Sequence, residues 1–326
     1  MTDRYTSFEA TAAGYTTDTH TFTANRHDID VVTEDISPDR GHQYVVTSKG
    51  RTPRAKLIGP LGWTGNIETL LYTKHASSLL YYAMGGNSTV VDMPTLGVQQ
   101  HTLTPATSIP HFIMATGRDL FEHQYVGCVA TGFSIDFAPD SPLSANFDIN
   151  ARKELATGTA LGTVTYEDFD AAERTFSGVE IASAMGAAEG GAPTADTTIE
   201  SANISYENNF ESDAYVLGDQ HLSGKFVNQI ELTGSLEFSF LTIGDYDDVV
   251  GDVDKELWFT ATQGAGAAER GYVIKLPRIS YNSTNLPTNN AERYVQSVDF
   301  TATDNAAGNN IEIVVTNDML AAEFIA

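Results

Sequence analysis

The residues best suited to chemistry are six carboxylates in a short acidic run. They are Asp245, Asp247, Asp248, Asp252, Asp254 and Glu256. Carboxylate oxygens are preferred calcium ligands, and the EF-hand loop is built from a comparable run. Here the glycine and the closing glutamate stand at the wrong spacing for that loop. The run is therefore better interpreted as a solvated acidic helix face, and it predicts no metal site.

The histidines and the glycine-rich stretches offer no other reactive constellation. The eight histidines, at positions 20, 27, 42, 75, 101, 111, 123 and 221, form no HExxH motif and no i, i+4 pair. The sequence also has no GxSxG motif, no P-loop and no GxGxxG motif before a helix. We therefore expect no catalytic residue, no cofactor and no metal, and we expect that the protein is not an enzyme.

One basic cluster stands out in this acidic chain. Lys49, Arg51, Arg54 and Lys56 lie within the sequence SKGRTPRAKLIG and account for four of the 18 basic residues. A solvated loop would explain the cluster. A second explanation is a loop that docks on the acidic surface of a neighbouring copy, where complementary charge fixes the register of assembly.

The net charge of −25, from 43 acidic and 18 basic residues, disfavours nucleic-acid binding. Lysine is scarce while aspartate and glutamate are spread along the whole chain. This pattern indicates a proteome adapted to molar salt, where the Debye length of about 3 Å screens self-repulsion. An ordinary acidic protein is the alternative.

Cysteine content and hydropathy indicate where the protein is made. Cys128 is the single cysteine, which excludes an intrachain disulfide, and its strand-like surroundings predict a buried small hydrophobe. The N-terminus lacks the apolar region of a secretory signal. No apolar run reaches the roughly 18 residues that a membrane span needs. We expect synthesis in the cytoplasm and no contact with a membrane.

An internal repeat predicts the organisation of the chain. TGNIETLL from Thr64 aligns with TGSLEFSF from Thr233, an offset of 169 residues. The alternating residues match in turn: Ile67, Thr69 and Leu71 align with Leu236, Phe238 and Phe240. Such alternation is typical of half-buried strands. Tyr125-Val126 and Tyr294-Val295 repeat at the same offset, so the repeat predicts an old duplication.

Each copy of the repeat is expected to contain the same elements. Residues 74–86 and 244–258 each predict a short helix, and residues 109–117 and 271–277 each predict a strand. Each copy then closes with a hairpin, over 133–149 in the first and 298–315 in the second, because Asp, Pro, Gly and Asn mark the turns. We expect an N-terminal arm over 1–40, a first domain over 41–155, a linker with inserted loops over 156–198, and a second domain over 199–326.

Two stretches resemble tail tube proteins of long-tailed viruses. The run Ile109–Ile149 combines an Ile-Pro strand, a Tyr-x-Gly-Cys step at Tyr125–Cys128 and a long alternating hairpin. Ala202–Gln220 followed by Leu232–Phe240 is similar to the second half of these proteins. The resemblance covers most of residues 40–317, and the Tyr-x-Gly-Cys hairpin is its most specific part.

The resemblance implies a mainly β fold with two tandem tail-tube-type domains. Each would be an antiparallel β-sandwich or half-barrel with one short flanking helix. Domain sheets would join edge to edge into a barrel, and three two-domain chains would make a pseudo-hexameric ring. Stacked rings would form the tail tube of a siphovirus-like virus with a halophilic host, made in the host cytoplasm and carrying viral DNA only in transit. Other tail proteins would bind the tube ends, and the loop with Lys49, Arg51, Arg54 and Lys56 would stack rings.

Two other readings remain open at this point. One is a different ring-forming tail or decoration component of related fold. The other is a sugar-binding β-sandwich, which would expose aromatic residues on a binding face. Trp63 and Trp258 stand at the starts of elements and are expected to be packing residues instead.

Overall fold

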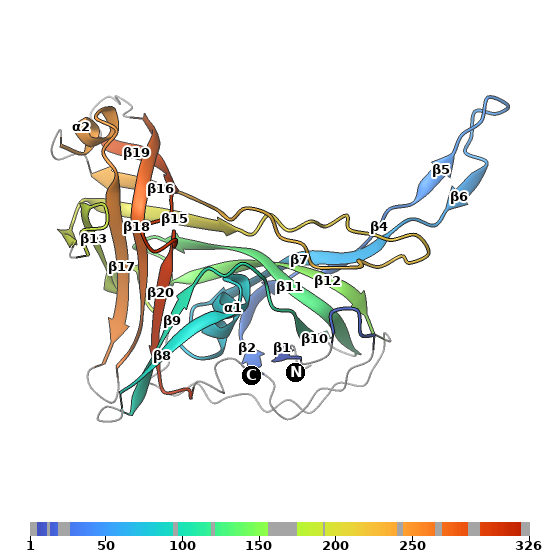
Figure 1. Cartoon of the computed structure of the whole chain (residues 1–326), viewed down its shortest axis with the longest axis horizontal. Helices are drawn as coiled ribbons and strands as arrows, with labels where there is room; N and C mark the ends of the chain where they lie inside the picture. The colour runs from blue at the N-terminus through green and yellow to red at the C-terminus, as the bar shows by residue number, and fades with distance from the viewer. Residues whose placement is uncertain are drawn as a thin grey trace.

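The fold is built almost entirely from antiparallel strands, in a computed structural model of the chain (Figure 1). The structure describes residues 5–11, 14–18, 27–93, 97–118, 121–155, 175–191, 193–239, 244–264, 269–285 and 294–320. No helix within these ranges is long and apolar enough to cross a membrane.

The elements of the first half, up to residue 155, are β1 (Tyr5–Ala10), β2 (His27–Ile29), β3 (Val31–Glu34), β4 (Ser37–Arg40), β5 (Gln43–Val45), β6 (Ala55–Leu57), β7 (Leu61–Leu70), α1 (His75–Ala83), β8 (Asn87–Met93), β9 (Val98–Thr104), β10 (Phe112–Arg118), β11 (Phe121–Phe137) and β12 (Ser144–Glu154). The elements of the second half, from residue 175, are the 3-10 turn η1 (Gly178–Glu180), β13 (Ile181–Ala187), β14 (Thr194–Asp196), β15 (Ile199–Glu207), β16 (Glu231–Ser239), α2 (Gly244–Val250), β17 (Lys255–Gln263), β18 (Arg270–Asn285), β19 (Val295–Ala302) and β20 (Glu312–Asn317). Both expected helices and both expected strands are present, although the second helix ends at Val250 and residues 255–258 belong to β17.

The strands form two connected layers. The main sheet runs in the order β3 and β4, β7, β12, β11, β15, β16, β19 and the C-terminal part of β18. The second sheet runs β8, β9, β20, the N-terminal part of β18, β17, β13 and β14. In Figure 1, β17, β18 and β20 stand upright at the left, while β11 and β12 run across the middle. The long strand β18 thus belongs to both layers.

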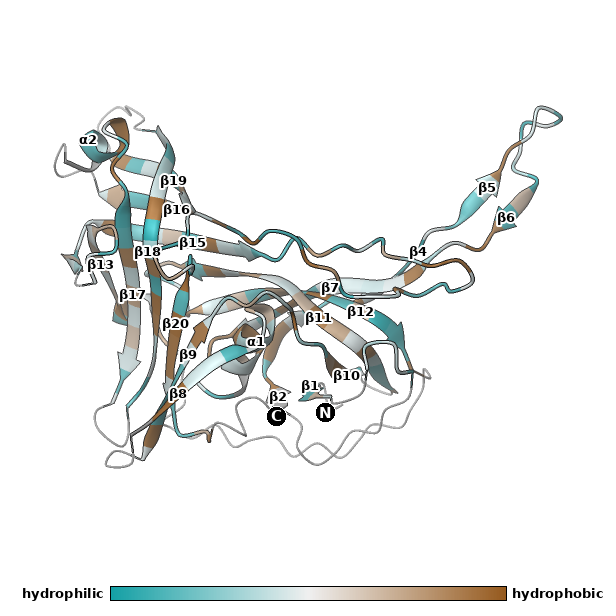
Figure 2. Cartoon of the chain, in the orientation of Figure 1, coloured by the Kyte–Doolittle hydropathy of each residue, from teal (hydrophilic) through white to brown (hydrophobic). Residues whose placement is uncertain are grey.

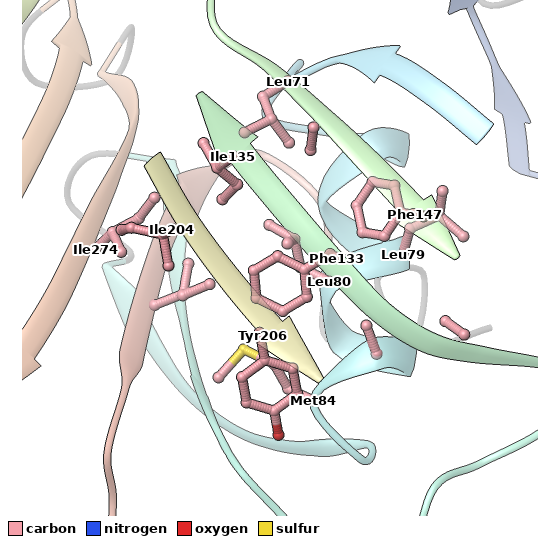
Figure 3. Close-up of a cluster of buried hydrophobic side chains, with 14 of the residues drawn as sticks. Leu71, Leu79, Leu80, Met84, Phe133, Ile135, Phe147, Ile204, Tyr206 and Ile274 are labelled. Atoms are coloured by element: carbon pink, nitrogen blue, oxygen red, sulfur yellow. The ribbon is translucent and has the colours of Figure 1, made fainter. Parts of the chain in front are cut away.

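A single hydrophobic core fills the space between the layers. It includes Phe133, Phe147 and Ile204 from the main sheet and Ile274 from the second sheet (Figure 3). Helix α1 contacts β11 and contributes the fully buried Leu79 and Leu80. Burial of side chains this size contributes about 1.5–3 kcal/mol each, so the core joins the two layers into one unit.

One predicted hairpin is wrong. The first, over 133–149, is present as β11 and β12, with Phe133 opposite Phe147. In the second half, β19 pairs with β16 and β18, whereas β20 pairs with β18 and β9. The polar segment after Ala302 therefore carries the chain from the main sheet to the second sheet. Strand alternation was correctly predicted there, but alternation does not specify the pairing partner.

The two halves nevertheless share one pairing pattern. Strand β10 lies between β1 and β11, and β17 correspondingly lies between β13 and β18. Strand β12 lies between β11 and β7, and β19 lies between β18 and β16. Gly65 on β7 is opposite Ile149, while Gly234 on β16 is opposite Phe300. The alignment of Thr64 with Thr233 is therefore consistent with the strand pairing. The alignment of Tyr125 with Tyr294 is wrong, because Tyr125 lies on β11, which corresponds to β18, whereas Tyr294 directly precedes β19, which corresponds to β12.

A bulge at the same place supports this correspondence. Thr131 is an extra residue on β11 between the pairs Ala130–Ile149 and Gly132–Asp148. Asn282 is likewise an extra residue on β18, between the pairs Tyr281–Phe300 and Ser283–Asp299. Bulges are position-specific features of a fold rather than defects, so a shared bulge indicates equivalent strands.

The predicted domain boundaries remain a prediction. The described part of the expected arm contains β1 to β4, and Phe8 of β1 is fully buried. The described part of the expected linker, from residue 175, contains η1, β13 and β14. The rest of that linker, residues 156–174, lies outside the described residues, as does Phe240.

Candidate assembly surfaces

Strands β11 and β15 join the two halves into one continuous sheet. Phe133 is opposite Tyr206 and Ile135 is opposite Ile204. The rings of Phe133 and Tyr206 are stacked, with centroids 5.0 Å apart and an interplanar angle of 15°. All four side chains are buried. An edge strand of one half is thus completed by an edge strand of the other, which removes two exposed edges.

The main sheet has an open edge at each end, and these two edges correspond to the two edges that meet at the β11–β15 junction. Strand β4 corresponds to β15, because Ser37 lies opposite Thr64 just as Ser205 lies opposite Thr233. Strand β18 corresponds to β11 through the shared bulge. Among the described residues, β4 pairs only with β7, and the stretch from Ser283 to Asn285 pairs only with β19. Each half therefore retains one edge of the kind that the β11–β15 junction uses.

The main sheet has one apolar face and one polar face. Side chains of the central polar face come from cross-strand neighbours: Asn66, Glu68, Ser134, Asp136, Asn146, Asp148, Asn203, Ser205, Glu207, Ser235, Glu237 and Asp299. None of these residues is basic. Asn203 Nδ2 donates to Asp136 Oδ1 at 2.6 Å, and Ser201 and Ser283 donate to Glu237 and Asp299. The face is therefore a uniformly neutral or anionic surface.

Crowding on this face changes the titration of two carboxyl groups. Partial burial, followed by the charge of Asp35, raises the pKa of Asp148. Partial burial, followed by the charges of Asp148 and Glu231, raises the pKa of Glu207. Both shifts mean that the negative charge on this face is held against an energetic penalty rather than neutralised by a basic partner.

The predicted basic residues all lie on one projecting hairpin. We call residues 41–60 the basic hairpin; it contains β5 and β6 and extends away from the body (Figure 1). The structure places Lys49, Arg51, Arg54 and Lys56 together there. All four are exposed, and none forms an ion pair with any described residue. The hairpin also exposes large apolar side chains, with Ile58 at 70% exposure. Its ribbon accordingly carries hydrophobic stretches, coloured brown in Figure 2.

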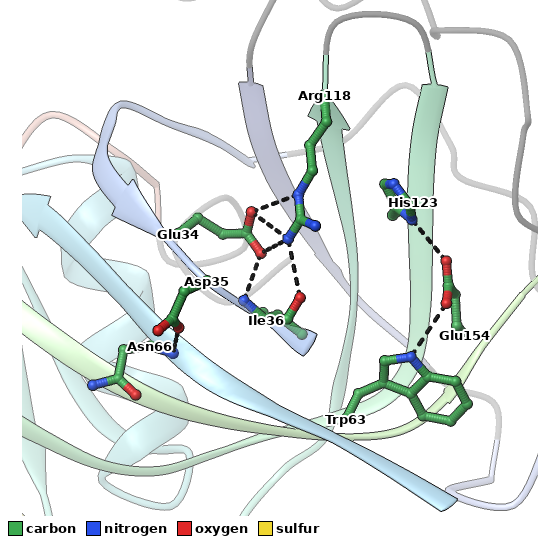
Figure 4. A network of polar contacts seen from close by, with 8 residues as sticks. All are labelled: Glu34, Asp35, Ile36, Trp63, Asn66, Arg118, His123 and Glu154. Atoms are coloured by element: carbon green, nitrogen blue, oxygen red, sulfur yellow. Dashed lines mark hydrogen bonds and ion pairs between the residues drawn. The ribbon is translucent and has the colours of Figure 1, made fainter. Parts of the chain in front are cut away.

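A polar network holds the base of the basic hairpin (Figure 4). The Arg118 guanidinium donates to Glu34 Oε2, at 3.0 Å from Nε and 2.7 Å from Nη2, and to the Ile36 carbonyl at 3.0 Å. Glu154 accepts from Trp63 Nε1 at 3.2 Å and contacts His123 Nδ1 at 2.7 Å. Because these bonds tie β3, Ile36 and β7 to β10, β11 and β12, the hairpin projects from a fixed base.

The second half contains an excursion that no sequence motif predicts. Residues 208–230 leave the body between β15 and β16 and return along β7 and β12 (Figure 1). The Leu61 amide donates to the Gln220 carbonyl at 2.8 Å, and Trp63 stacks on His221 with centroids 5.9 Å apart. The internal repeat could have predicted this excursion, because the basic hairpin lies at the corresponding position of the first half, between β4 and β7.

Arg152 fixes the excursion to the first half. Its side chain is only 4% exposed, and its Nε donates to the Leu222 carbonyl at 2.9 Å. Its guanidinium also forms ion pairs with Asp18 and, at 3.5 Å, with Asp219. A buried arginine needs such partners, so its burial depends on the excursion being in place.

The acidic run is not one solvated helix face as expected, because Asp252, Asp254 and Glu256 lie beyond the end of α2, and its members make separate structural contacts. Asp248 forms an ion pair with Lys255 at 2.6 Å, and Asp254 forms one with Arg278 at 2.6 Å. Glu256, which is buried, accepts from the Gly191 amide at 2.8 Å. Within the described part of the chain, no group of three His, Cys, Asp or Glu residues could hold a metal ion. Cys128 is fully buried as expected, and burial raises the pKa of its thiol.

These features define a structural β protein with open, matching sheet edges and projecting hairpins. Residues 6–303 match the model of the phage tail tube protein family, so the chain belongs to that family and is a structural component of the virion tail. No curated protein matches the chain.

Proposed function

We propose that this protein forms closed rings that stack into the tail tube and provide the channel for viral DNA during ejection. The observation that carries this proposal is the β11–β15 junction, which unites the two halves into a single sheet. The same kind of edge is open at β4 and at the end of β18. A second copy can complete each open edge as the two halves complete one another.

The internal junction supplies the register for the contact between copies. At the internal junction, Phe133 lies opposite Tyr206 and Ser134 lies opposite Ser205. The corresponding pairs between copies are Thr284 with Pro38 and Asn285 with Ser37 of the next copy. Backbone hydrogen bonds across such an edge provide affinity in strand-addition complexes. Pro38 has no N–H, which reduces indiscriminate pairing of this edge.

Three copies in a ring follow from the two halves of the chain. A ring closed from three chains would contain six related units and alternate internal and intermolecular junctions around it. Closure removes the two open edges of the main sheet, as in other β-barrels. The domain boundaries expected from the sequence, at 41–155 and 199–326, are part of this proposal.

The polar face of the main sheet is proposed to line the channel. The apolar face is already occupied by the core, so the face with Asp136, Asp148, Glu207 and Glu237 is the one available to the channel. An anionic wall repels phosphates, and DNA would pass without strong binding. The absence of basic residues from this central face supports a channel role beyond the general acidity of the chain.

The basic hairpin is proposed to contact a neighbouring copy through Lys49, Arg51, Arg54 and Lys56, either in the next ring, as the expected ring-stacking role requires, or within the same ring. The opposite charge of the remaining surface supports this role. We also propose a siphovirus-like virus with a halophilic host, from the net charge of −25 and the scarcity of lysine. Tail proteins at the two tube ends complete the set of proposed partners.

Negative-stain electron microscopy of the purified protein in molar and in low salt tests this function. The proposal expects stacked rings with a central channel and threefold symmetry. Dispersed single chains in both salts at high protein concentration would contradict the proposal. Rings of six chains would contradict the trimer while leaving the tube.

A further inference from the structure

The second half carries an open groove of about 730 Å³ beside the start of β16 and the end of β19. Residues from both strand ends line it, including Ile230, Leu232, Thr301, Thr303 and Asp304. Asp304 and the neighbouring Glu231 are exposed, so the groove has an acidic rim. No residue of the basic hairpin contributes to its lining.

The groove corresponds to the surface that holds the 208–230 excursion on the first half. The alignment of Thr64 with Thr233 places Leu61 at Ile230 and Trp63 at Leu232. The pairing of Asn150 with Thr64 and of Thr301 with Thr233 then places Arg152 at Thr303. On the first half, Leu61, Trp63 and Arg152 all contact the excursion.

The basic hairpin corresponds to the excursion itself. Both lie between equivalent strands, and both fold back on themselves: Val45 pairs with Ala55, and Tyr215 pairs with Leu222. Gly50 lies in the turn of the first and Gly218, with a φ of 94°, in the turn of the second. Each half thus has one surface and one hairpin, but only the excursion is seated.

The charges on the two pairs are reversed. In the seated pair, the surface supplies the cation Arg152 and the excursion supplies the anion Asp219. On the second half, the groove supplies Asp304 and Glu231, while the hairpin supplies Lys49, Arg51, Arg54 and Lys56. Each pair is complementary, and exchanging the two hairpins would place like charges together.

We propose that the basic hairpin of one copy docks in the groove beside the start of β16 and the end of β19 of the adjacent copy in the same ring. This inference rests on the proposed ring. The occupant comes from a second copy because β5 and β6 lie at the opposite end of the molecule from β16 (Figure 1). At the internal junction, the excursion of the second half lies on the first half of the same chain. By the same relationship, the basic hairpin on the first half of the next copy lies on the second half of this copy.

Thiol cross-linking of assembled tubes tests the docking. The double variant Arg51→Cys with Asp304→Cys is treated with a short bis-maleimide and analysed on a denaturing gel. The fully buried Cys128 gives little background. We expect cross-linked species of two and three chains and none larger, because a ring contains three copies. The matched control pairs Arg51→Cys with Asp140→Cys, an exposed acidic position in the turn between β11 and β12.

The outcomes separate this inference from the proposed function. Tubes without cross-linking above the control would overturn the docking and leave the tube intact. A series of species running past three chains would place the hairpin in the next ring and would also overturn it. If the wild-type protein forms no rings, both proposals fail. A charge-reversal pair provides a second test: Asp304→Arg should reduce assembly at least tenfold, and adding Arg51→Asp should restore it.

Discussion

Phe133 and Tyr206 stack across the junction between β11 and β15, although one belongs to the first half and the other to the second. Both side chains are almost completely buried. The contact therefore makes the two halves one cooperative unit, and it provides the internal example of the junction that we propose between copies.

Truncation of this stacked pair should destabilise the whole chain. We expect Phe133→Ala to lower the free energy of unfolding by about 3–5 kcal/mol, because a buried aromatic ring leaves a cavity. Thermal and denaturant unfolding measure the change. Tyr206→Phe is the matched control, because the buried hydroxyl has no hydrogen-bond partner among the described residues and burial raises its pKa. A near-neutral Phe133→Ala would contradict a cooperative junction.

Arg152 should control the order of the 208–230 excursion. We expect Arg152→Met to cost about 1–3 kcal/mol, because it removes charge-assisted bonds to Leu222 and Asp219 while retaining the apolar stem. Amide exchange should then increase in residues 215–222. Lys153→Met is the control, since that lysine is 30% exposed and its ion pair with Asp18 contributes little. Equal exchange in both variants would show that Arg152 does not hold the excursion.

His101 should make the protein less stable in mild acid. The ring is fully buried between β9 and β20, with Nε2 3.1 Å from Asn317 Oδ1. Burial lowers its pKa below the ordinary value of about 6.5. Between the two values the unfolded chain binds more protons, so stability is present above about pH 6.5 and declines as pH falls below it.

Unfolding measured between pH 5 and 8 tests this assignment. His101→Gln should flatten the acid-side decline, whereas His42→Gln on the basic hairpin should preserve it. A decline that is unchanged in His101→Gln would assign the acid sensitivity to another group.

Asp148 should be a destabilising charge that is retained for the surface it creates. Its pKa is raised by burial and then by Asp35, and its charge in turn raises the pKa of Glu207. Asp148→Asn should therefore stabilise the chain by roughly 0.5–1 kcal/mol in low salt, and by less in molar salt. The stabilisation should be present at pH values above the ordinary pKa range of aspartate and should disappear in acid. Asp140→Asn, in an exposed turn, is the control; equal effects would argue against crowding at Asp148.

Local elements of the fold were predictable from sequence because their patterns are local. The alternation around Thr64 and Thr233 identified β7 and β16, and the turn after Phe137 identified the β11–β12 hairpin. Pairing partners were not predictable in the same way. Ile311, Ile313 and Val315 alternate as expected, but β20 pairs with β9 of the first half. Alternation identifies the buried face of a strand and leaves its neighbour unspecified.

The sequence likewise predicts some features of the assembly surfaces and leaves others unpredicted. The basic residues from Lys49 to Lys56 were visible as a charge cluster, although their place on a projecting hairpin required the structure. The 208–230 excursion carried no charge signal, and its role became clear only from the contacts of Arg152. Likewise, the polar face is assembled from single residues on many strands, so no continuous segment could reveal it.

A three-dimensional reconstruction of the assembled tube by cryo-electron microscopy tests the central claim most directly. The account predicts three chains per ring, β18 of each chain beside β4 of the next, and Asp148 and Glu207 facing the channel. Six chains per ring, or a channel lined by another face of the sheet, would contradict it.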